Sequence, residues 1–321
     1  MSRVLVTPRS LTGGGDELVA PLREAGYEVV RGAPGRQPTE QELVELLPGC
    51  VGWVAGVEPI GPRVLDAAPD LRAISRNGAG VDNIDLDAAR ARRIEVLRAD
   101  GANARGVAEL TIALYLACAR GIVPSAVALR DGGWERALGG EAAGRTLGVI
   151  GAGAIGRLVL SLARGLGMET LATDPLAPAE LVERDGTRLV ELDELLARCD
   201  AVSLHRPAPA DGRAVIGAAE LERMRGGAVL LNTARASLVD DGAVLAALDG
   251  GRLAAYATDV FEEEPPRPSA LLRHPRVLAT PHIGGFTSDS VRRAATAAID
   301  NLLAVLGARA GGPQNAEGTR R

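Results

Sequence analysis

The chain has 321 residues, of which 46% are hydrophobic and 24% are charged, and its formal net charge at pH 7 is −5. These proportions are typical of a folded globular protein, and the length allows two domains that each bury a core. The acidic balance and the 2% aromatic content argue against nucleic acid as a partner. The apolar runs are shorter than the roughly 20 residues that cross a bilayer, so no membrane association is expected.

The cysteines and the first residues of the chain give two further expectations, one about metals and one about location. Cys50, Cys118 and Cys199 match no metal-ligand spacing, so we expect no metal. The sequence enters a predicted strand directly after MSR, without a basic segment followed by a long apolar stretch. We therefore expect a cytoplasmic protein.

Short β-rich runs alternate with helical patterns through the first hundred residues. Such alternation predicts a mostly parallel sheet with helices on both faces, so we expect a small doubly wound domain. The predicted strands are Val4–Val6, Tyr27–Val30, Val51–Val54, Leu71–Ser75 and Ile94–Leu97, and the helical patterns include Glu17–Ala25 and Glu40–Leu47.

A second series of strands and helices follows and predicts a second α/β domain over residues 101–286. It opens with a nearly uninterrupted apolar helix, Val107–Ala119, which we expect to be buried as a crossover helix, and with a helix near Ser125–Leu129. A last helix, Ser288–Leu306, is expected to return to the first domain. Later strands are predicted at Ala201–Leu204, Ala228–Asn232, Leu253–Thr258 and Val277–Ala279, with helices at Asp193–Ala197, Gly217–Met224 and Asp240–Leu248.

Residues 146–174 carry the most informative motif of the chain, an apolar strand that leads through GxGxxG into an amphipathic helix. Gly151 permits the tight turn, Gly153 lets the backbone approach a pyrophosphate, and Gly156 lets the helix pack closely on the strand. Asp174 lies eighteen residues after Gly156, at the end of the next apolar strand. An acid there can accept hydrogen bonds from ribose hydroxyls and would repel a 2′-phosphate, so the motif predicts NAD binding.

Three later segments place reactive side chains just after predicted strands, where ligands bind in open α/β sheets. They bring Arg235, then Asp259 with the acidic run Glu262–Glu264, and finally His282. Each has a structural alternative: a surface ion pair for the arginine, a solvated turn for the acids, and a packing role for the histidine. Because the three segments occur together in this order, a shared catalytic role of Arg235, the acidic residues and His282 is favoured. Asp82 and Asp85 are expected to cap a turn and a helix.

These motifs together resemble the D-isomer-specific 2-hydroxyacid dehydrogenases, in particular the phosphoglycerate dehydrogenase-like branch without the C-terminal regulatory domain. The resemblance runs over nearly the whole chain. Its motifs are SRNGAGVDNIDLDAA (75–89), VAELTIAL (107–114), the glycine motif with Asp174, NTARASLVDDGAVLAAL (232–248), DVFEEEPP (259–266) and PHIGG (281–285).

The resemblance implies two doubly wound, Rossmann-like α/β domains with a cleft between them. Residues 1–100 and 287–321 would form a flavodoxin-like substrate domain, and residues 101–286 the NAD-binding domain. It also implies a homodimer that forms through the Val107–Leu129 helices and the loop after them.

The family's catalytic arginine, acid and histidine fall on Arg235, Glu264 and His282. A guanidinium can hold a carboxylate through two hydrogen bonds. A histidine titrates near neutrality and can exchange the hydroxyl proton, and a neighbouring carboxylate favours its imidazolium form.

Further contacts carry over from the same resemblance. The substrate contacts would be Arg76, Asn77, Gly78, Ala79, Gly80, Arg136 and Arg235. The cofactor contacts would be Gly151, Gly153, Ala154, Ile155, Gly156, Asp174, Arg206, Thr233, Ala234, Asp259, His282, Gly284 and Gly285.

The expected function is hydride transfer between NAD and C2 of a D-2-hydroxy acid or 2-keto acid with a polar or anionic tail. One position that carries a phosphate-binding arginine in the phosphoglycerate branch is Ala55 here, which argues against 3-phosphoglycerate itself. Two alternatives remain open: a dehydrogenase of a phosphonate, phosphite or related anion, and a non-catalytic NADH-sensing protein of the corepressor kind.

Overall fold

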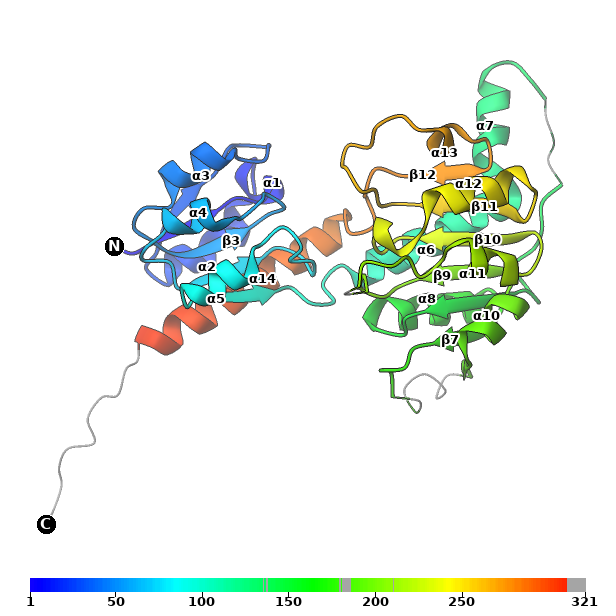
Figure 1. Cartoon of the computed structure of the whole chain (residues 1–321). Helices are drawn as coiled ribbons and strands as arrows, with labels where there is room; N and C mark the ends of the chain where they lie inside the picture. The colour runs from blue at the N-terminus through cyan, green and yellow to red at the C-terminus, as the bar shows by residue number, and fades with distance from the viewer. Residues whose placement is uncertain (135, 137, 179, 181–185, 210, 311–321) are drawn as a thin grey trace, which may run out of the picture. The chain divides into compact units, whose positions relative to one another are not determined.

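The chain divides into two compact units (Figure 1). The computed structural model describes residues 1–134, 136, 138–178, 180, 186–209 and 211–310. Unit 1 contains Met1–Asn103 and helix α14 (Ser288–Ala310), and unit 2 contains Ala104–Thr287. The assignment of substrate binding to the first of these units stays a prediction.

Unit 1 is built on a five-stranded parallel sheet in the order β2-β1-β3-β4-β5. The first strand lies inside the sheet, as in doubly wound folds. The strands are β1 (Arg3–Val6), β2 (Glu28–Arg31), β3 (Cys50–Ala55), β4 (Ala73–Arg76) and β5 (Glu95–Arg98).

Both faces of the unit 1 sheet are buried, since its inner strands carry apolar side chains on both sides. Leu5 and Trp53 belong to the cluster on one face, and Val4 and Val6 pack with Leu302 of α14 on the other. Besides α14, the helices are α1 (Arg9–Thr12), α2 (Asp16–Glu24), α3 (Glu40–Leu46), α4 (Pro62–Asp66) and α5 (Leu86–Ala91).

Unit 2 contains a seven-stranded parallel sheet in the order β12-β11-β10-β9-β6-β7-β8. The strand order reverses where β6 and β9 lie side by side, and the carboxyl ends of strands at such a point form a ligand-binding crevice. The strands are β6 (Thr146–Ile150), β7 (Glu169–Thr173), β8 (Arg188–Leu189), β9 (Ala201–Leu204), β10 (Ala228–Asn232), β11 (Leu253–Thr258) and β12 (Val277–Ala279).

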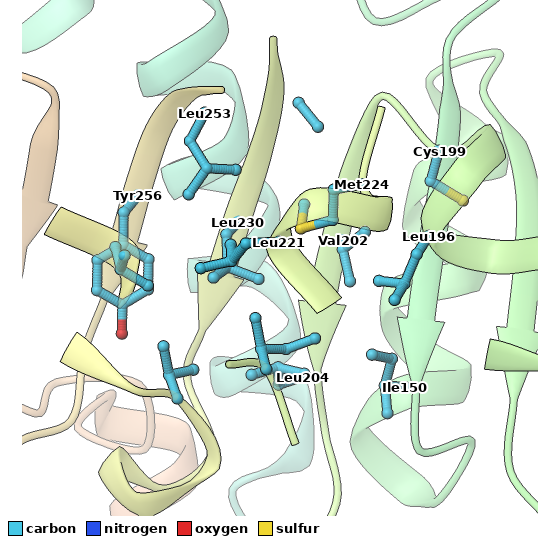
Figure 2. Packing of buried hydrophobic residues seen from close by; sticks show 14 of the residues in the cluster. Ile150, Leu196, Cys199, Val202, Leu204, Leu221, Met224, Leu230, Leu253 and Tyr256 are labelled. Carbon is cyan, nitrogen blue, oxygen red and sulfur yellow. The ribbon is translucent and has the colours of Figure 1, made fainter. Parts of the chain in front are cut away.

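Two apolar clusters hold the unit 2 helices to its sheet. One contains Tyr115 and Leu160, from two helices that pack on each other. In the other, shown in Figure 2, Leu204, Leu230 and Tyr256 of the strands meet the neighbouring helices. The helices are α6 (Ala104–Arg120), α7 (Ile122–Arg130), α8 (Ala154–Gly165), α10 (Leu192–Arg198), α11 (Ala218–Arg223), α12 (Asp241–Asp249), α13 (Ala270–Arg273) and the 3-10 turn η1 (Ala236–Leu238).

The sequence patterns missed the shortest elements. The helices α1, α4 and α13 have four or five residues, and β8 has two. Segments of this length are too short to show a hydrophobic period. The expected capping role of Asp85 is confirmed, since its side chain accepts a hydrogen bond of 2.8 Å from Ala88 N at the start of α5.

Among the described residues, no single helix is long and apolar enough to span a membrane. Helices α6 and α7 reach that length and composition only as a pair, and they are bent by 65° at the break between them. Helix α6 packs on α8 and on strand β10 of its own unit.

Candidate active site

The glycine motif forms the turn between β6 and α8, and its three glycines meet different surroundings. Gly151 has a φ of 100°, and a Cβ there would lie 2.6 Å from the carbonyl oxygen of His205. A Cβ on Gly156 would lie 2.0 Å from the carbonyl oxygen of Gly151, so this glycine allows α8 to pack on the turn. A Cβ on Gly153, the N-cap of α8, would meet no atom within 4 Å. Open space thus lies in front of a helix N-terminus, which suits a pyrophosphate.

Asp174 directly follows β7 and fixes this turn. Its Oδ2 accepts a hydrogen bond of 2.8 Å from Ala152 N, and its Oδ1 accepts one of 2.9 Å from Leu176 N. Each carboxylate oxygen can accept a second hydrogen bond, so ribose hydroxyls can still bind. A cavity of about 550 Å³ borders Asp174, Pro175 and Val190, and this volume is in the range of small-molecule sites. The residues of this half of the site therefore fit a dinucleotide.

His205 and Arg206 lie beside the same glycine turn, at the end of β9. A Cβ on Gly151 would come within 2.9 Å of the Arg206 Cβ. Nε2 of His205 is 2.7 Å from Ser203 Oγ, and no described residue pairs with its buried Nδ1. Burial lowers the pKa of His205 to about 3, which keeps the ring neutral.

The second half of the site starts from three adjacent strands. In the parallel sheet Asn232 of β10 pairs with Thr258 of β11, and Thr258 pairs with Ala279 of β12. Neighbouring strands lie about 4.8 Å apart, so the loops that follow these residues start within about 10 Å of one another. These loops carry Arg235, Glu264 and His282.

A buried amide holds the loop of Arg235. Asn232 is fully buried; its Nδ2 donates to the Arg235 carbonyl at 2.9 Å, and its Oδ1 accepts from Ala234 N at 3.1 Å. Thr233 Oγ1 contacts Thr111 Oγ1 of α6 at 2.9 Å. Arg235 Nη1 donates to the Ala234 carbonyl at 2.7 Å. The side chain of Asn232, the last residue of β10, thus fixes the backbone of the loop that carries the Arg235 guanidinium.

A buried carboxylate holds the turn of His282, which has a φ of 52°. Asp259 is 1% exposed and accepts three hydrogen bonds, from Thr280 Oγ1 at 2.6 Å, Ile283 N at 2.8 Å and Gly284 N at 2.7 Å. The two backbone donors directly follow His282 in the chain. Asp259 therefore sets the conformation of the histidine turn from inside the unit.

His282 and Glu264 are in direct contact. Nδ1 of the histidine lies 2.7 Å from Oε1 and 2.8 Å from Oε2 of the carboxylate, and Oε1 also accepts a hydrogen bond of 3.3 Å from Phe261 N. The side chain of His282 is 52% exposed and that of Glu264 is 40% exposed. With Nδ1 held by the carboxylate, Nε2 is the nitrogen that remains for a ligand.

The expected substrate turn lies in unit 1, at the end of β4. Asn77 N donates to the Ala55 carbonyl at 2.8 Å, Gly78 has a φ of 151°, and Arg76 Nη1 donates to the Asn77 carbonyl. Arg136 is exposed in unit 2. The substrate-binding roles of these residues stay predictions.

Sequence reasoning did not find the residues that support these loops, namely Asn232, Tyr256 and Thr280. Tyr256 on β11 hydrogen-bonds with the side chains of Thr258 and Asn232, and burial raises its pKa to about 12. The sequence feature that could have identified such residues is a polar residue at the end of an apolar strand, as in the LLN segment that ends β10. A buried polar residue there needs a partner, and loop backbone is the nearest one.

Comparison with known proteins gives consistent matches. Residues 112–284 match the model described as "D-isomer specific 2-hydroxyacid dehydrogenase, NAD binding domain". The D-3-phosphoglycerate dehydrogenase of Methanocaldococcus jannaschii is 38% identical over 91% of this chain and 56% of its own length, so the chain spans about half of that relative. The hydroxypyruvate reductase of Thermotoga maritima is 37% identical over 84% of this chain and 89% of its own length.

The solved structure of the TT0316 protein from Thermus thermophilus superposes with a TM-score of 0.85 at 37% identity, and the match covers 95% of this chain and 97% of that one. The predicted α/β fold with two parallel sheets is confirmed by this likeness, and the predicted cofactor NAD by the family's NAD-binding domain. The chain belongs to the D-isomer-specific 2-hydroxyacid dehydrogenase family.

Proposed function

We propose that this protein is an NAD-dependent dehydrogenase that interconverts a D-2-hydroxy acid and the corresponding 2-keto acid. The observation that carries the proposal is the contact of His282 Nδ1 with both oxygens of Glu264, on loops next to the Arg235 loop in the NAD-binding domain. Relatives named as D-3-phosphoglycerate dehydrogenase and hydroxypyruvate reductase support a 2-keto acid with a polar or anionic tail.

His282 is proposed as the general acid and base. Because Nδ1 is held by Glu264, Nε2 accepts the proton of the substrate hydroxyl during oxidation and returns it to the carbonyl oxygen during reduction. NAD, when bound, accepts or supplies the hydride at C2. Asp259 keeps the imidazole in place through the two backbone amides that follow it.

Glu264 is proposed to orient the ring. A carboxylate that touches Nδ1 fixes the tautomer in which Nδ1 carries hydrogen. Its two contacts of 2.7 and 2.8 Å also restrict rotation of the ring, although about half of the histidine side chain is exposed.

Arg235 is proposed to bind the substrate carboxylate and to polarise the C2 oxygen. Its planar guanidinium offers donors in the fork that a carboxylate matches. The Asn77–Gly80 turn of unit 1 is proposed to add backbone donors for the same carboxylate, and Arg76 and Arg136 are proposed as contacts to the tail.

We also propose a homodimer formed through α7. None of the nine residues of this helix is buried, and Ile122, Val127 and Leu129 are 52%, 44% and 59% exposed. Trp134, four residues beyond the helix, is 80% exposed. Exposed apolar side chains gathered on one helix suit an interaction site, and a two-fold interface would cover them with the same helix of a second copy.

Turnover tests the proposed activity. Purified protein with NADH and a panel of 2-keto acids should oxidise NADH at 340 nm, and His282→Ala and Arg235→Ala should each lower kcat/KM by a factor of at least about 10². Asp289→Ala, on the exposed first turn of α14, is a control that should keep full activity. Tight NADH binding without turnover of any acid in the panel would instead favour an NADH-sensing protein.

Light scattering tests the dimer. The wild-type protein should elute with twice the mass of the chain, and a Val127→Glu, Leu129→Glu double variant should elute as a monomer. If Arg136 acts across the interface, activity per chain should fall on dilution. A wild-type protein that stays monomeric at all concentrations contradicts the proposed assembly.

A further inference from the structure

Tyr256 of β11 carries a hydroxyl group into the apolar cluster on one face of the unit 2 sheet. The residue is 2% exposed and shares this cluster with Leu230, its register partner on β10. Figure 2 shows the hydroxyl at the end of the ring that points away from Leu253, the first residue of β11. The hydroxyl is therefore directed toward the carboxyl edge of the sheet, where ligands bind in open α/β folds.

Two buried polar side chains lie at that edge, on the same face of the sheet. Asn232 ends β10 and Thr258 ends β11, and the two residues are register partners. Thr258 is two positions beyond Tyr256, and side chains two positions apart on a strand share a face. The Tyr256 hydroxyl hydrogen-bonds with both side chains. Asn232 is fully buried and Thr258 is 3% exposed, so all three groups must find their partners inside the protein.

The other hydrogen bonds of Thr258 and Asn232 fix the direction of these two contacts. Thr258 Oγ1 donates its one hydrogen to the Val260 carbonyl at 3.0 Å, so it can only accept from Tyr256. The tyrosine also has one hydroxyl hydrogen, so toward Asn232 it must accept. Of the two hydrogens on Asn232 Nδ2, one goes to the Arg235 carbonyl at 2.9 Å and the other is left for Tyr256. The hydroxyl thus completes the hydrogen bonding of the amide that holds the Arg235 loop.

The other bonds of Asn232 do not anchor its side chain to the sheet, because their partners belong to the loop that it holds. Its Oδ1 accepts from Ala234 N at 3.1 Å, and its Nδ2 donates to the Arg235 carbonyl. The Tyr256 hydroxyl, by contrast, belongs to the neighbouring strand. It links the Arg235 loop to β11, the strand that leads into the loop of Glu264.

We propose that Tyr256 is a positioning residue for Arg235: its hydroxyl fixes the Asn232 amide, and the amide fixes the loop that carries the guanidinium. The inference rests on the proposed function, because it assumes that Arg235 binds the substrate carboxylate. Phenylalanine at position 256 would fill the same space but leave a buried N–H of Asn232 without an acceptor. The amide would then turn to find another partner, and the guanidinium would lose its fixed position.

Tyr256→Phe tests this role, and Tyr115→Phe is the matched control. Tyr115 of α6 is also buried, at 3% exposure, but it interacts with the charges of Arg145 and Asp200, which precede β6 and β9 at the opposite edge of the sheet. Reduction of the 2-keto acid that the wild-type protein turns over fastest is followed at 340 nm. Tyr256→Phe should lower kcat/KM about tenfold, chiefly through a higher KM for the acid. Tyr115→Phe should stay within about twofold of the wild type.

Two further readouts separate positioning from a purely structural role. The Kd for oxamate, an unreactive analogue of a 2-keto acid, should rise in Tyr256→Phe by about the same factor as the KM when NADH is present. In an Arg235→Lys background, Tyr256→Phe should lower kcat/KM by less than about twofold, because the planar fork that it positions is already gone. A purely structural role would lower Tm but leave the KM unchanged at temperatures well below Tm.

The outcomes distinguish this inference from the proposed function. If the wild-type protein reduces an acid but Tyr256→Phe keeps the wild-type KM and Kd for oxamate, the inference is wrong and the proposed function stands. The same holds if Tyr256→Phe lowers kcat/KM by an equal factor with Arg235 and with lysine at that position. If the wild-type protein reduces no acid of the panel, the proposed function and this inference both fail.

Discussion

Replacing Asp259 by asparagine should separate the positioning of His282 from the chemistry of the site. The carboxylate accepts Thr280 Oγ1 and Ile283 N on Oδ1 and Gly284 N on Oδ2. Asparagine is nearly isosteric and retains one acceptor oxygen. If that oxygen keeps the two bonds of Oδ1, the new amide nitrogen faces the N–H of Gly284, and two donors then point at each other.

The expected cost follows from these contacts. The variant loses one hydrogen bond to a charged group and leaves a buried N–H without an acceptor, which together should destabilise the protein by about 2–4 kcal/mol. For a unit of this size, that corresponds to a fall of roughly 5–15 °C in Tm. The turn with the left-handed His282 loses its anchor, and a displacement of about 1 Å from the reacting oxygen should reduce kcat by about 10²-fold.

Thermal unfolding, kcat at saturating NADH and the Kd for NADH should be measured together, because Asp259 is also a proposed cofactor contact. Thr280→Val is the matched control: it removes one hydrogen bond but leaves both backbone amides on the carboxylate. It should retain kcat within about threefold. An Asp259→Asn protein that melts like the wild type and keeps its kcat would refute the idea that this carboxylate positions the histidine.

Three further outcomes can be checked. Burial lowers the pKa of His205 to about 3, so below pH 6.5 the unfolded chain binds a proton at this residue that the native protein does not bind. The free energy of unfolding of the wild-type protein, measured by urea titration, should therefore fall between pH 7 and pH 5. This fall should be about 2 kcal/mol smaller in His205→Gln. Gly153→Ala should keep Tm within about 3 °C but raise the Kd for NADH at least about tenfold. Gly156→Ala should be strongly destabilised, because its Cβ would lie 2.0 Å from the carbonyl oxygen of Gly151. Burial raises the pKa of the Cys199 thiol to about 12, so it should react with a thiol reagent only after unfolding, and fast labelling of the native protein would contradict this.

Several properties could be predicted because they depend on neighbours in sequence. The glycine motif, the strand before it and the acid after the next strand identified the NAD-binding unit, and the order of the motifs identified the family. Apart from the two-residue β8, the strands of both sheets were predicted to within a residue or two, since each is a short apolar run. The catalytic roles, the substrate, the dimer and the cytoplasmic location stay predictions.

The acidic run after β11 shows where local reasoning stops. Glu262, Glu263 and Glu264 are equivalent by charge and position, and only the resemblance to the family favoured the last of them. In the folded chain Glu264 contacts His282, whereas Glu263 forms a salt bridge with Arg267. The choice depends on the direction in which the loop leaves β11.

The sequence by itself thus determined the longer elements, the cofactor motif and the family of this protein, because periodicity and motif spacing are local properties of the chain. The tertiary structure alone decided which distant groups share a buried polar contact. Glu58 meets Thr7 across 51 positions, and Asp259 holds the turn of His282 from a neighbouring strand. Such pairs form because burial removes water from polar atoms that are far apart in the chain, and each atom then needs a partner supplied by the fold.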